Sequence, residues 1–450
     1  MLPRAIRPAS RLPAQAVAVS ARTLTSSTSA GPQMAPSMSL VTSSAYCTRF
    51  NKPPLTQDHP GRAQIHTGQS RDSGAKPVEF VPESNIRVFR SVDNWRAFQD
   101  EDRGRSFALV PTMGALHEGH ISLIRAAARD NEHVVVSIYV NPAQFGIKED
   151  LSSYPVTWDQ DCKLLVELNT KLRQEGYVGQ VSAIFAPTTP EMYPSGFPGQ
   201  EIDSKGSFVT ITPVGEVLEG ASRPTFFRGV ATVCMKLFNI IRPSHVYFGQ
   251  KDVQQTVIIR RMVQDFRMPI DVVIGPTVRE SDGLALSSRN VYLGERRRKV
   301  ATVLSRALRA AEGKYLQGEL SREEILGAAN KVAADMLEVQ KRLAPEERVL
   351  YEVDYISLAS PETMAELDSV DPNTGGILSG AIKMLPVEAP RQGENLGHSG
   401  GPAVRLIDNI ILKPQVPQTE EQPSAAQEIP KEAQDPLERI GLQVATEGKA

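Results

Sequence analysis

The decapeptide from Pro111 to His120, Pro-Thr-Met-Gly-Ala-Leu-His-Glu-Gly-His, constrains the fold of this chain more than any other stretch. The apolar run Phe107–Val110 before it is typical of a buried strand, and apolar residues recur at helical spacing in the segment 121–129 after it. A strand, a glycine-bearing turn and a helix start form a site for anions, because the first N–H groups of a helix lack partners and the helix dipole favours negative charge. The stretch therefore predicts a strand–turn–helix unit that binds phosphate.

Two histidines, His117 and His120, lie three residues apart in this turn and are expected on one helical face. Imidazole N–H groups can donate hydrogen bonds to phosphoryl oxygens. One alternative is an ordinary pair of exposed or buried histidines, and another is half of a zinc site, which needs further ligands at fixed spacing. The remaining histidines and the cysteines form no such cluster in the sequence: His59, His66, His133, His245, His398, Cys47, Cys162 and Cys234. The context favours the phosphate interpretation.

Strand and helix patterns alternate along the middle of the chain. Strands are predicted at 107–110, 134–140, 182–185, 245–248 and 271–274, and helices after His120 and at 229–241 and 253–266. Such alternation predicts an α/β fold with a Rossmann-like, doubly wound parallel sheet. Ligands of these sheets bind beyond the carboxyl ends of the strands, at a topological switch point.

The chain divides into four segments. Residues 1–80 form a leader, 81–290 the doubly wound domain, 291–412 a smaller C-terminal α+β domain, and 413–450 a tail that is expected to be disordered because it lacks apolar periodicity. In the smaller domain, helical pattern from about Leu304 gives way to short strands near 351–358, 376–383 and 405–412. A low-complexity piece at 387–403 is expected to be a surface insertion.

Composition excludes several classes of protein. The 450 residues carry a net charge of −2, which gives no global attraction to nucleic acid or to an anionic membrane. No apolar run approaches the ~18–20 residues of a membrane span. Three scattered cysteines argue against a disulfide scaffold and for a reducing compartment.

The leader is rich in serine and basic residues, and no acidic residue precedes Asp58. This composition resembles a mitochondrial transit peptide. The alternative is a disordered extension on a cytoplasmic protein.

The decapeptide resembles the signature of the pantothenate synthetase (pantoate–β-alanine ligase) family, within the nucleotidylyl-transferase superfamily that carries His-x-Gly-His. Three further blocks match the family in the same order: Val140-Asn-Pro-Ala-Gln-Phe-Gly146, Phe248-Gly-Gln-Lys-Asp-Val-Gln-Gln255 and Asp282-Gly-Leu-Ala-Leu-Ser-Ser-Arg-Asn290. The resemblance extends from about residue 86 to Leu412, where 405–412 is similar to the family's closing strand. It implies a eukaryotic, fungal-like form with N- and C-terminal extensions, and a C-terminal domain that covers the active site and supports a homodimer.

The resemblance also implies a reaction. Pantoate would attack the α-phosphate of ATP to give pantoyl adenylate and pyrophosphate, and β-alanine would then displace AMP to give pantothenate. ATP is then a substrate, Mg²⁺ a cofactor, and neither nucleic acid nor a membrane is a partner. The alternatives are a nucleotidylyl transferase that acts on another acceptor and a nucleotide-binding protein without catalysis.

By the same resemblance, His117 and His120 contact the nucleotide phosphates, and His120 occupies the position usually described as the proton donor. Lys251 would place a positive charge on the phosphates. Ser287, Ser288 and Arg289 would stabilise the leaving pyrophosphate. The implied ATP site as a whole comprises Met113, Gly114, His117, Gly119, His120, Gly249, Gln250, Lys251, Asp252, Val278, Leu286, Ser287, Ser288 and Arg289.

Gln144 and Gln255 resemble the residues that bind pantoate, and Gln144 also resembles a β-alanine contact. A neutral amide donates and accepts hydrogen bonds at once, which suits a hydroxy acid. Asp252 resembles a magnesium carboxylate, and Arg223 is expected to hold the triphosphate or to order the loop above it.

Each of these roles has a simpler alternative. Lys251 and Arg223 would be solvated surface residues. Asp252 would be the N-cap of the helix that starts after it. Ser287 and Ser288 would only cap a helix.

The chain departs from the family pattern at two positions. Gln250 replaces a glutamate and Phe226 replaces a histidine. Activity is still expected, because the two-histidine turn and the serine–arginine motif are intact.

Overall fold

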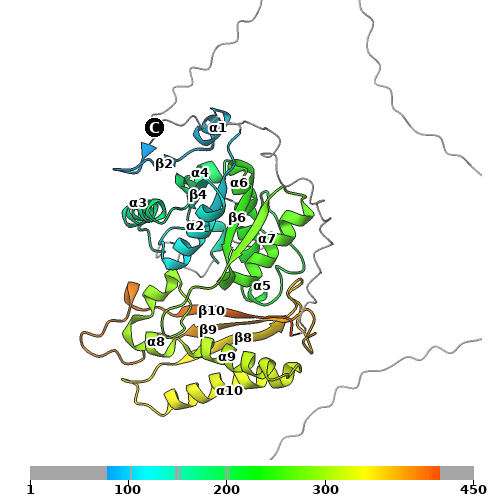
Figure 1. Cartoon of the computed structure of the whole chain (residues 1–450). Helices are drawn as coiled ribbons and strands as arrows, with labels where there is room; N and C mark the ends of the chain where they lie inside the picture. Colours follow the sequence, from blue (N-terminus) through cyan, green and yellow to red (C-terminus); the bar gives the residue numbers. More distant parts are fainter. Residues whose placement is uncertain are drawn as a thin grey trace, which may run out of the picture. The chain divides into compact units, whose positions relative to one another are not determined.

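The computed structural model describes residues 79–415, apart from 102–103, 147–150, 152–153, 198, 200 and 202 (Figure 1). Most of the predicted leader and tail, and Cys47, lie outside these residues. Their proposed boundaries shift slightly, because Glu79 and Phe80 already form a strand. Residues 413–415 also belong to the folded part: the carbonyl of Lys413 accepts a hydrogen bond from the Tyr315 hydroxyl at 2.8 Å, and the Gln415 N–H donates to the Pro372 carbonyl at 2.9 Å.

A seven-stranded sheet forms the larger layer and confirms the predicted doubly wound α/β fold. Its strands in chain order are β1 (Glu79–Phe80), β2 (Arg87–Phe89), β3 (Ala108–Thr112), β4 (His133–Ile138), β5 (Gln180–Phe185), β6 (His245–Gly249) and β7 (Asp271–Gly275). The spatial order is β1-β2-β5-β4-β3-β6-β7. Every neighbouring pair is parallel except β1 with β2.

Helices cover both faces of this sheet, since successive side chains of a strand point to opposite faces. In β3, Leu109 packs into the core with the helices 226–241 and 253–265, whereas Ala108 and Val110 pack into the core with the helices 118–130 and 158–174. The helices of this part are α1 (Val92–Glu101), α2 (Glu118–Asp130), α3 (Trp158–Gln174), α4 (Thr189–Met192), α5 (Glu219–Ser222), α6 (Phe226–Ile241) and α7 (Val253–Asp265). No element was predicted in the stretch that forms α3.

The topological switch point lies between β3 and β6. From β3 the chain passes through α2 to β4 on one side, while β6 and β7 occupy the other side. The decapeptide leaves the carboxyl end of β3, and Gly249–Asp252 spans the carboxyl end of β6. The fold therefore brings these two motifs to the position where such sheets bind ligands.

A second, antiparallel sheet follows, in the order β10-β9-β8, with β8 (Tyr351–Ala359), β9 (Gly376–Met384) and β10 (Val404–Leu412). Its helices are α8 (Gly294–Val300), α9 (Val303–Leu316) and α10 (Arg322–Lys341). Ala307 of α9 and Leu378 of β9 share its core. The helical region begins at Gly294, ten residues before the predicted Leu304.

The segment 387–403, predicted to be a surface insertion, connects β9 to β10 and is bound by side chains of α8. The Arg297 side chain is completely buried and donates hydrogen bonds to the carbonyls of Pro402 (2.6 Å) and Leu396 (3.1 Å). Arg296 and Glu394 form an ion pair with both side chains about one-tenth exposed. The prediction missed this anchoring because the residues that hold the segment come from α8.

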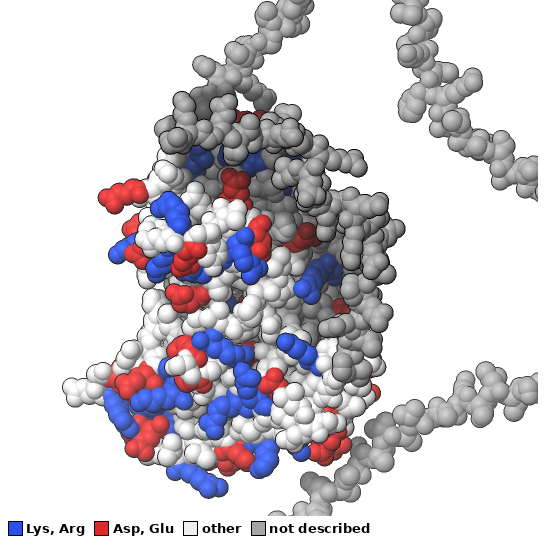
Figure 2. All heavy atoms as spheres, viewed as in Figure 1, with Lys and Arg blue, Asp and Glu red and all other residues white. Residues whose placement is uncertain are grey.

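Two observations concern membranes and charged partners. No helix among residues 79–415, as far as these are described, has the length and apolar character to cross a membrane. Figure 2 shows basic and acidic side chains interspersed on the face that it views.

Candidate functional site

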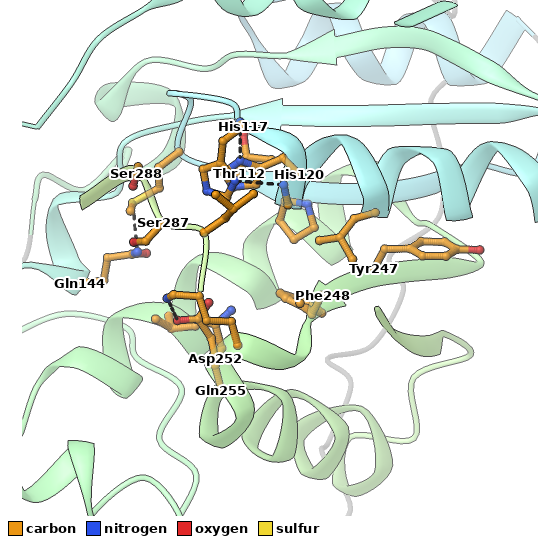
Figure 3. A pocket seen from close by; sticks show the side chains of 18 of the residues that line it. Thr112, His117, His120, Gln144, Tyr247, Phe248, Asp252, Gln255, Ser287 and Ser288 are labelled. Carbon is orange, nitrogen blue, oxygen red and sulfur yellow. Dashed lines mark hydrogen bonds and ion pairs between the residues drawn. The ribbon is translucent and has the colours of Figure 1, made fainter. Parts of the chain in front are cut away.

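A cavity of about 210 Å³ lies at the switch point (Figure 3). Most of the predicted site residues line it: Met113, His117, Gly119, His120, Gln144, Gly249, Lys251, Asp252, Gln255, Val278, Leu286, Ser287, Ser288 and Arg289. A second cavity of about 570 Å³ adjoins it and shares Lys251, Asp252 and Ser287 with it. Together the two cavities offer the several hundred Å³ that a nucleotide and a small acid require.

Two predicted ATP-site residues do not line either cavity. Gly114 lies beneath the turn, and Gln250 faces Asn409 of β10, to whose side-chain oxygen its amide donates a hydrogen bond at 3.2 Å. Their expected place in the ATP site stays a prediction. Gln250, one of the two departures from the family pattern, contacts the smaller sheet instead.

The histidine turn is a helix cap. Helix α2 begins at Glu118, three residues before the predicted start at Ile121, and His117 is its N-cap. Nδ1 of His117 accepts from the Gly119 N–H at 3.1 Å, and Nδ1 of His120 accepts from the His117 N–H at 3.3 Å. This reciprocal pair is a capping box built from imidazoles, and it sets the two ring centroids 4.1 Å apart.

These two hydrogen bonds determine the protonation of both rings. Because each Nδ1 accepts a backbone N–H, the proton of each neutral imidazole resides on Nε2. Burial, with Lys251 nearby and opposed by Asp252, lowers the pKa of His117 from 6.5 to about 4. Burial, followed by His117 and Lys251, lowers the pKa of His120 from 6.5 to about 3. Both rings are therefore neutral near pH 7 and offer Nε2–H donors.

The backbone of the turn is held by a residue that the sequence reasoning missed. Asp161, in the first turn of α3 and 1% exposed, accepts hydrogen bonds from the N–H groups of Ala115 (3.0 Å) and Leu116 (2.8 Å). Burial raises the pKa of Asp161. Gly114 has φ +82° and Ala115 +50°, so the carboxylate stabilises a left-handed bend. The sequence signal that could have pointed to Asp161 is its place as an acidic residue early in the amphipathic stretch that forms α3.

The absence of a side chain at Gly119 makes the cap possible. A Cβ at this position would lie 2.8 Å from Cε1 of His117, closer than two such atoms approach. The glycine thus leaves room for the imidazole to reach back and cap the helix.

The opposite wall carries the basic residue. In Figure 3, Asp252 and Gln255 face the histidines from the start of α7. The Lys251 side chain is 17% exposed, with Nζ 3.5 Å from Oδ1 of Asp252, so the surface alternative is wrong. Asp252 immediately precedes α7, but its side chain makes no capping hydrogen bond, so the capping alternative is wrong as well. Its carboxylate remains open to the cavity.

The serine motif caps a short helix and also lines the cavity. Ser287 caps the short 3₁₀ helix η4 (Ser288–Tyr292), accepting from the Arg289 N–H at 3.2 Å, and also lines the cavity. The hydroxyl of Ser288 lies 3.3 Å from that of Tyr154, a lining residue that was not predicted.

The glutamines lie beside an apolar wall. Gln144 ends the 3₁₀ helix η1 (Pro142–Gln144), where its side-chain oxygen accepts from the Asn141 amide at 3.1 Å and its own amide donates to the Met113 sulfur at 3.0 Å. Val230, Val233 and Leu237 of α6 complete the lining there. Asn141, 1% exposed, was also missed; it was visible in the Val140–Gly146 block.

Arg223 orders the loop above this wall. Its guanidinium lies 3.8 Å above the Phe226 ring and donates to Glu219 (2.9 Å) and to the Gln144 carbonyl (3.2 Å). With its side chain 13% exposed, the surface alternative is wrong. The phenylalanine that replaces the family's histidine thus serves as the platform for this arginine.

Within the described residues, no three His, Cys, Asp or Glu side chains gather to hold a metal ion. The zinc alternative for the two histidines therefore has no ligand set there. Two of the predicted free cysteines, Cys162 and Cys234, are buried and unbridged.

Comparisons with known proteins agree with this site. The family model for Pantoate-beta-alanine ligase matches residues 87–411. The pantothenate synthetase of Roseiflexus castenholzii is 42% identical over 328 residues, which is 73% of this chain and all of the relative. That of Chloroflexus aggregans is 45% identical over 303 residues, 67% of this chain and 92% of the relative.

Solved structures give the same result. The pantothenate synthetase of Thermus thermophilus is 37% identical, with a TM-score of 0.56 over 73% of this chain and 100% of that one. The ligase of Francisella tularensis, complexed with "Beta-gamma ATP and Beta-alanine", is 27% identical, with a TM-score of 0.51 over 72% of this chain and 97% of that one. This chain belongs to the pantoate–β-alanine ligase (pantothenate synthetase) family.

Proposed function

We propose that this protein condenses pantoate with β-alanine at the expense of ATP, through pantoyl adenylate, releasing AMP and pyrophosphate. The observation that carries the proposal is the composition of one cavity. Hydrogen-bond donors and cations suited to phosphate, namely the two Nε2–H groups, Lys251 and Arg289, line the same cavity as a pair of glutamines and an apolar wall. An enzyme that adenylates a small branched hydroxy acid needs this combination.

Adenylation requires positioning and positive charge more than covalent help from the protein. The Nε2–H groups of His117 and His120 donate hydrogen bonds to the α-phosphate as charge develops on it. Lys251 and Arg289 neutralise the pyrophosphate that leaves. With a pKa of about 3, His120 acts as a neutral hydrogen-bond donor rather than as an imidazolium acid.

The acceptor acid binds on the glutamine side. Gln144 and Gln255 hydrogen-bond the hydroxyl and carboxylate groups of pantoate, and Gln144 later contacts the incoming β-alanine amine. The apolar wall of Val230, Val233 and Leu237 accommodates the dimethyl carbon of pantoate. The binding of β-alanine to the Francisella relative supports this second half-reaction.

The cavity suits Mg²⁺ held mainly by the nucleotide. Asp252 is the carboxylate among the described lining residues, and its side chain is 45% exposed. Mg²⁺ is commonly bound by one or two carboxylates together with substrate phosphates, so Asp252 fits as the protein ligand. A bound Mg²⁺ would neutralise phosphate charge.

The reaction is tested by the nucleotide product. Incubation with ATP, pantoate and β-alanine should release AMP and pyrophosphate in amounts that match pantothenate. Release of ADP, or AMP formation that does not require pantoate, would refute the proposal, and no turnover at all would indicate a binding protein.

The role of His120 is tested with two shape-matched variants. His120→Asn keeps an acceptor where Nδ1 lies and so preserves the cap, but it loses the Nε2–H donor. His120→Gln places an amide N–H close to Nε2. We expect His120→Asn to lower pantoate-dependent exchange between ATP and pyrophosphate by about 10²–10³-fold, with His120→Gln retaining more. Near-normal exchange by a folded His120→Asn protein would show that the ring is structural.

We further propose a homodimer and a mitochondrial location, consistent with a eukaryotic, fungal-like form with extensions at both ends. The location is supported by the basic, serine-rich leader without acidic residues before Asp58. The dimer is supported by the resemblance to the family. Light scattering on the purified protein measures its mass and tests the dimer.

A further inference from the structure

We propose that Asn409, on strand β10 of the smaller sheet, is a positioning residue for Lys251. The inference rests on the proposed function, in which Lys251 places its charge on the phosphates. It concerns a buried residue that lines neither of the two cavities and lies 158 positions away from the lysine in sequence.

The side-chain hydrogen bonds of Asn409 all go to the turn that carries the lysine. Its side-chain amide donates to the carbonyl oxygens of Gln250 (2.9 Å) and Lys251 (2.8 Å). Its side-chain oxygen accepts from the Gln250 amide at 3.2 Å. Asn409 is completely buried, so no solvent replaces these bonds. The turn η3 (Gln250–Asp252) is thus held from the outside at two consecutive carbonyls.

Support from outside matters because the turn has no side-chain cap of its own. Gly249 precedes η3 and has no side chain to cap it, and Asp252, the last residue of η3 and the N-cap of α7, makes no capping hydrogen bond. The Lys251 side chain must nevertheless extend from this turn into the cavity, facing the histidines. Fixing the Lys251 carbonyl fixes the direction in which its Cα–Cβ bond points, and through it the ammonium position.

Asn409 can act in this way because its strand is itself immobilised. β10 is an edge strand that pairs with β9 (Figure 1), and its Asn409 side chain contacts η3. The neighbouring Asp408, 5% exposed, forms two short hydrogen bonds to Arg279 (2.6 and 2.7 Å), and Arg279 also donates to the Asn409 carbonyl at 3.3 Å. These bonds fix the register of β10 against the nucleotide-binding part.

The experiment is a double-mutant cycle with Asn409→Leu and Lys251→Ala. Leucine matches asparagine in size, adds no charge near the phosphates and removes the donors. The first readout is the ATP dissociation constant from calorimetry, which needs no turnover. The second is the kcat and KM of pantoate-dependent exchange between ATP and pyrophosphate. Asn409→Ser, whose hydroxyl is too short to reach both carbonyls, serves if the leucine variant does not fold.

If Asn409 acts through Lys251, Asn409→Leu weakens ATP binding about tenfold when the lysine is present and leaves it unchanged in the Lys251→Ala background. The kcat for exchange falls by about ten- to a hundredfold, whereas KM for pantoate stays near the wild-type value. The matched control is Leu412→Ala, on the same strand and 2% exposed, which lowers the unfolding temperature without changing either readout.

Equal losses of ATP affinity in both backgrounds would overturn the inference, because Asn409 would then act on the fold as a whole. An unchanged ATP affinity in Asn409→Leu would overturn it as well. A wild-type protein without pantoate-dependent exchange would refute the proposed function instead, and the calorimetric cycle would still decide the role of Asn409.

Discussion

The two neutral histidines of the cavity should make the protein less stable in acid, by an amount that follows from their pKa values. In the unfolded chain an imidazole takes up a proton near pH 6.5, whereas in the folded protein His117 resists protonation down to about pH 4 and His120 down to about pH 3. Between these limits unfolding binds protons, so the free energy of unfolding decreases as the pH falls.

The effect is already large at pH 5. There an unfolded imidazole is protonated in all but a few per cent of molecules, while both folded rings are still mainly neutral. At about 1.4 kcal/mol per factor of ten, each ring lowers the free energy of unfolding by about 2 kcal/mol relative to pH 8, and the two together by about 4 kcal/mol. The effect is absent above about pH 7.5 and constant below the folded pKa values.

Urea unfolding between pH 5 and pH 8 measures this effect. Each of His117→Gln and His120→Gln should remove about 2 kcal/mol of the pH-dependent change, and the double variant about 4 kcal/mol. Other groups also titrate in this range, so the result is the difference between variant and wild type. Ile121→Ala on the same helix, at an 8% exposed position, is the control: it should lower stability equally at every pH.

If the double variant lost stability toward pH 5 as steeply as the wild type, the histidines would be protonated in the folded protein. The assignment of the protons to Nε2, and with it the role of both rings as neutral donors, would then be wrong.

Three further predictions concern the glutamines, the histidine turn and the leader. Gln144→Ala and Gln255→Ala should each weaken pantoate binding by about 1–3 kcal/mol and leave ATP binding nearly intact; equal loss of both ligands in calorimetry would show that the glutamines shape the fold. Asp161→Asn replaces one acceptor oxygen by a donor that faces backbone N–H groups, so it should lower the free energy of unfolding in urea by about 1–3 kcal/mol and weaken ATP binding. An unchanged ATP affinity would show that the histidine turn keeps its conformation without Asp161. Deletion of residues 1–78, which ends just before β1, should leave exchange activity unchanged, and a fluorescent fusion of 1–78 should enter mitochondria; a diffuse cytosolic signal would refute the targeting proposal.

The sequence alone determined the fold class and most of the cavity. Continuous apolar runs and apolar residues that recur with a period near 3.6 are local properties, so the strands and the helices after His120 and Lys251 were predictable. The gathering of the first three motifs also followed from the sequence, because each lies at the end of a predicted strand and parallel strands share one carboxyl edge. Gly114 and Gln250 belong to the motifs but line neither cavity, because a motif gives the order of residues but not the direction in which each one points.

The tertiary structure alone decided which partners the buried polar groups have. Nothing in the local pattern around Gln250 indicates that its amide contacts Asn409, 159 residues away, or that Asp161 holds the backbone of the histidine turn. The protons of His117 and His120 reside on Nε2 because backbone N–H groups approach Nδ1, a matter of the local geometry of the cap. A buried donor or acceptor must find a partner, but packing between distant segments decides which one, and no local periodicity records that choice.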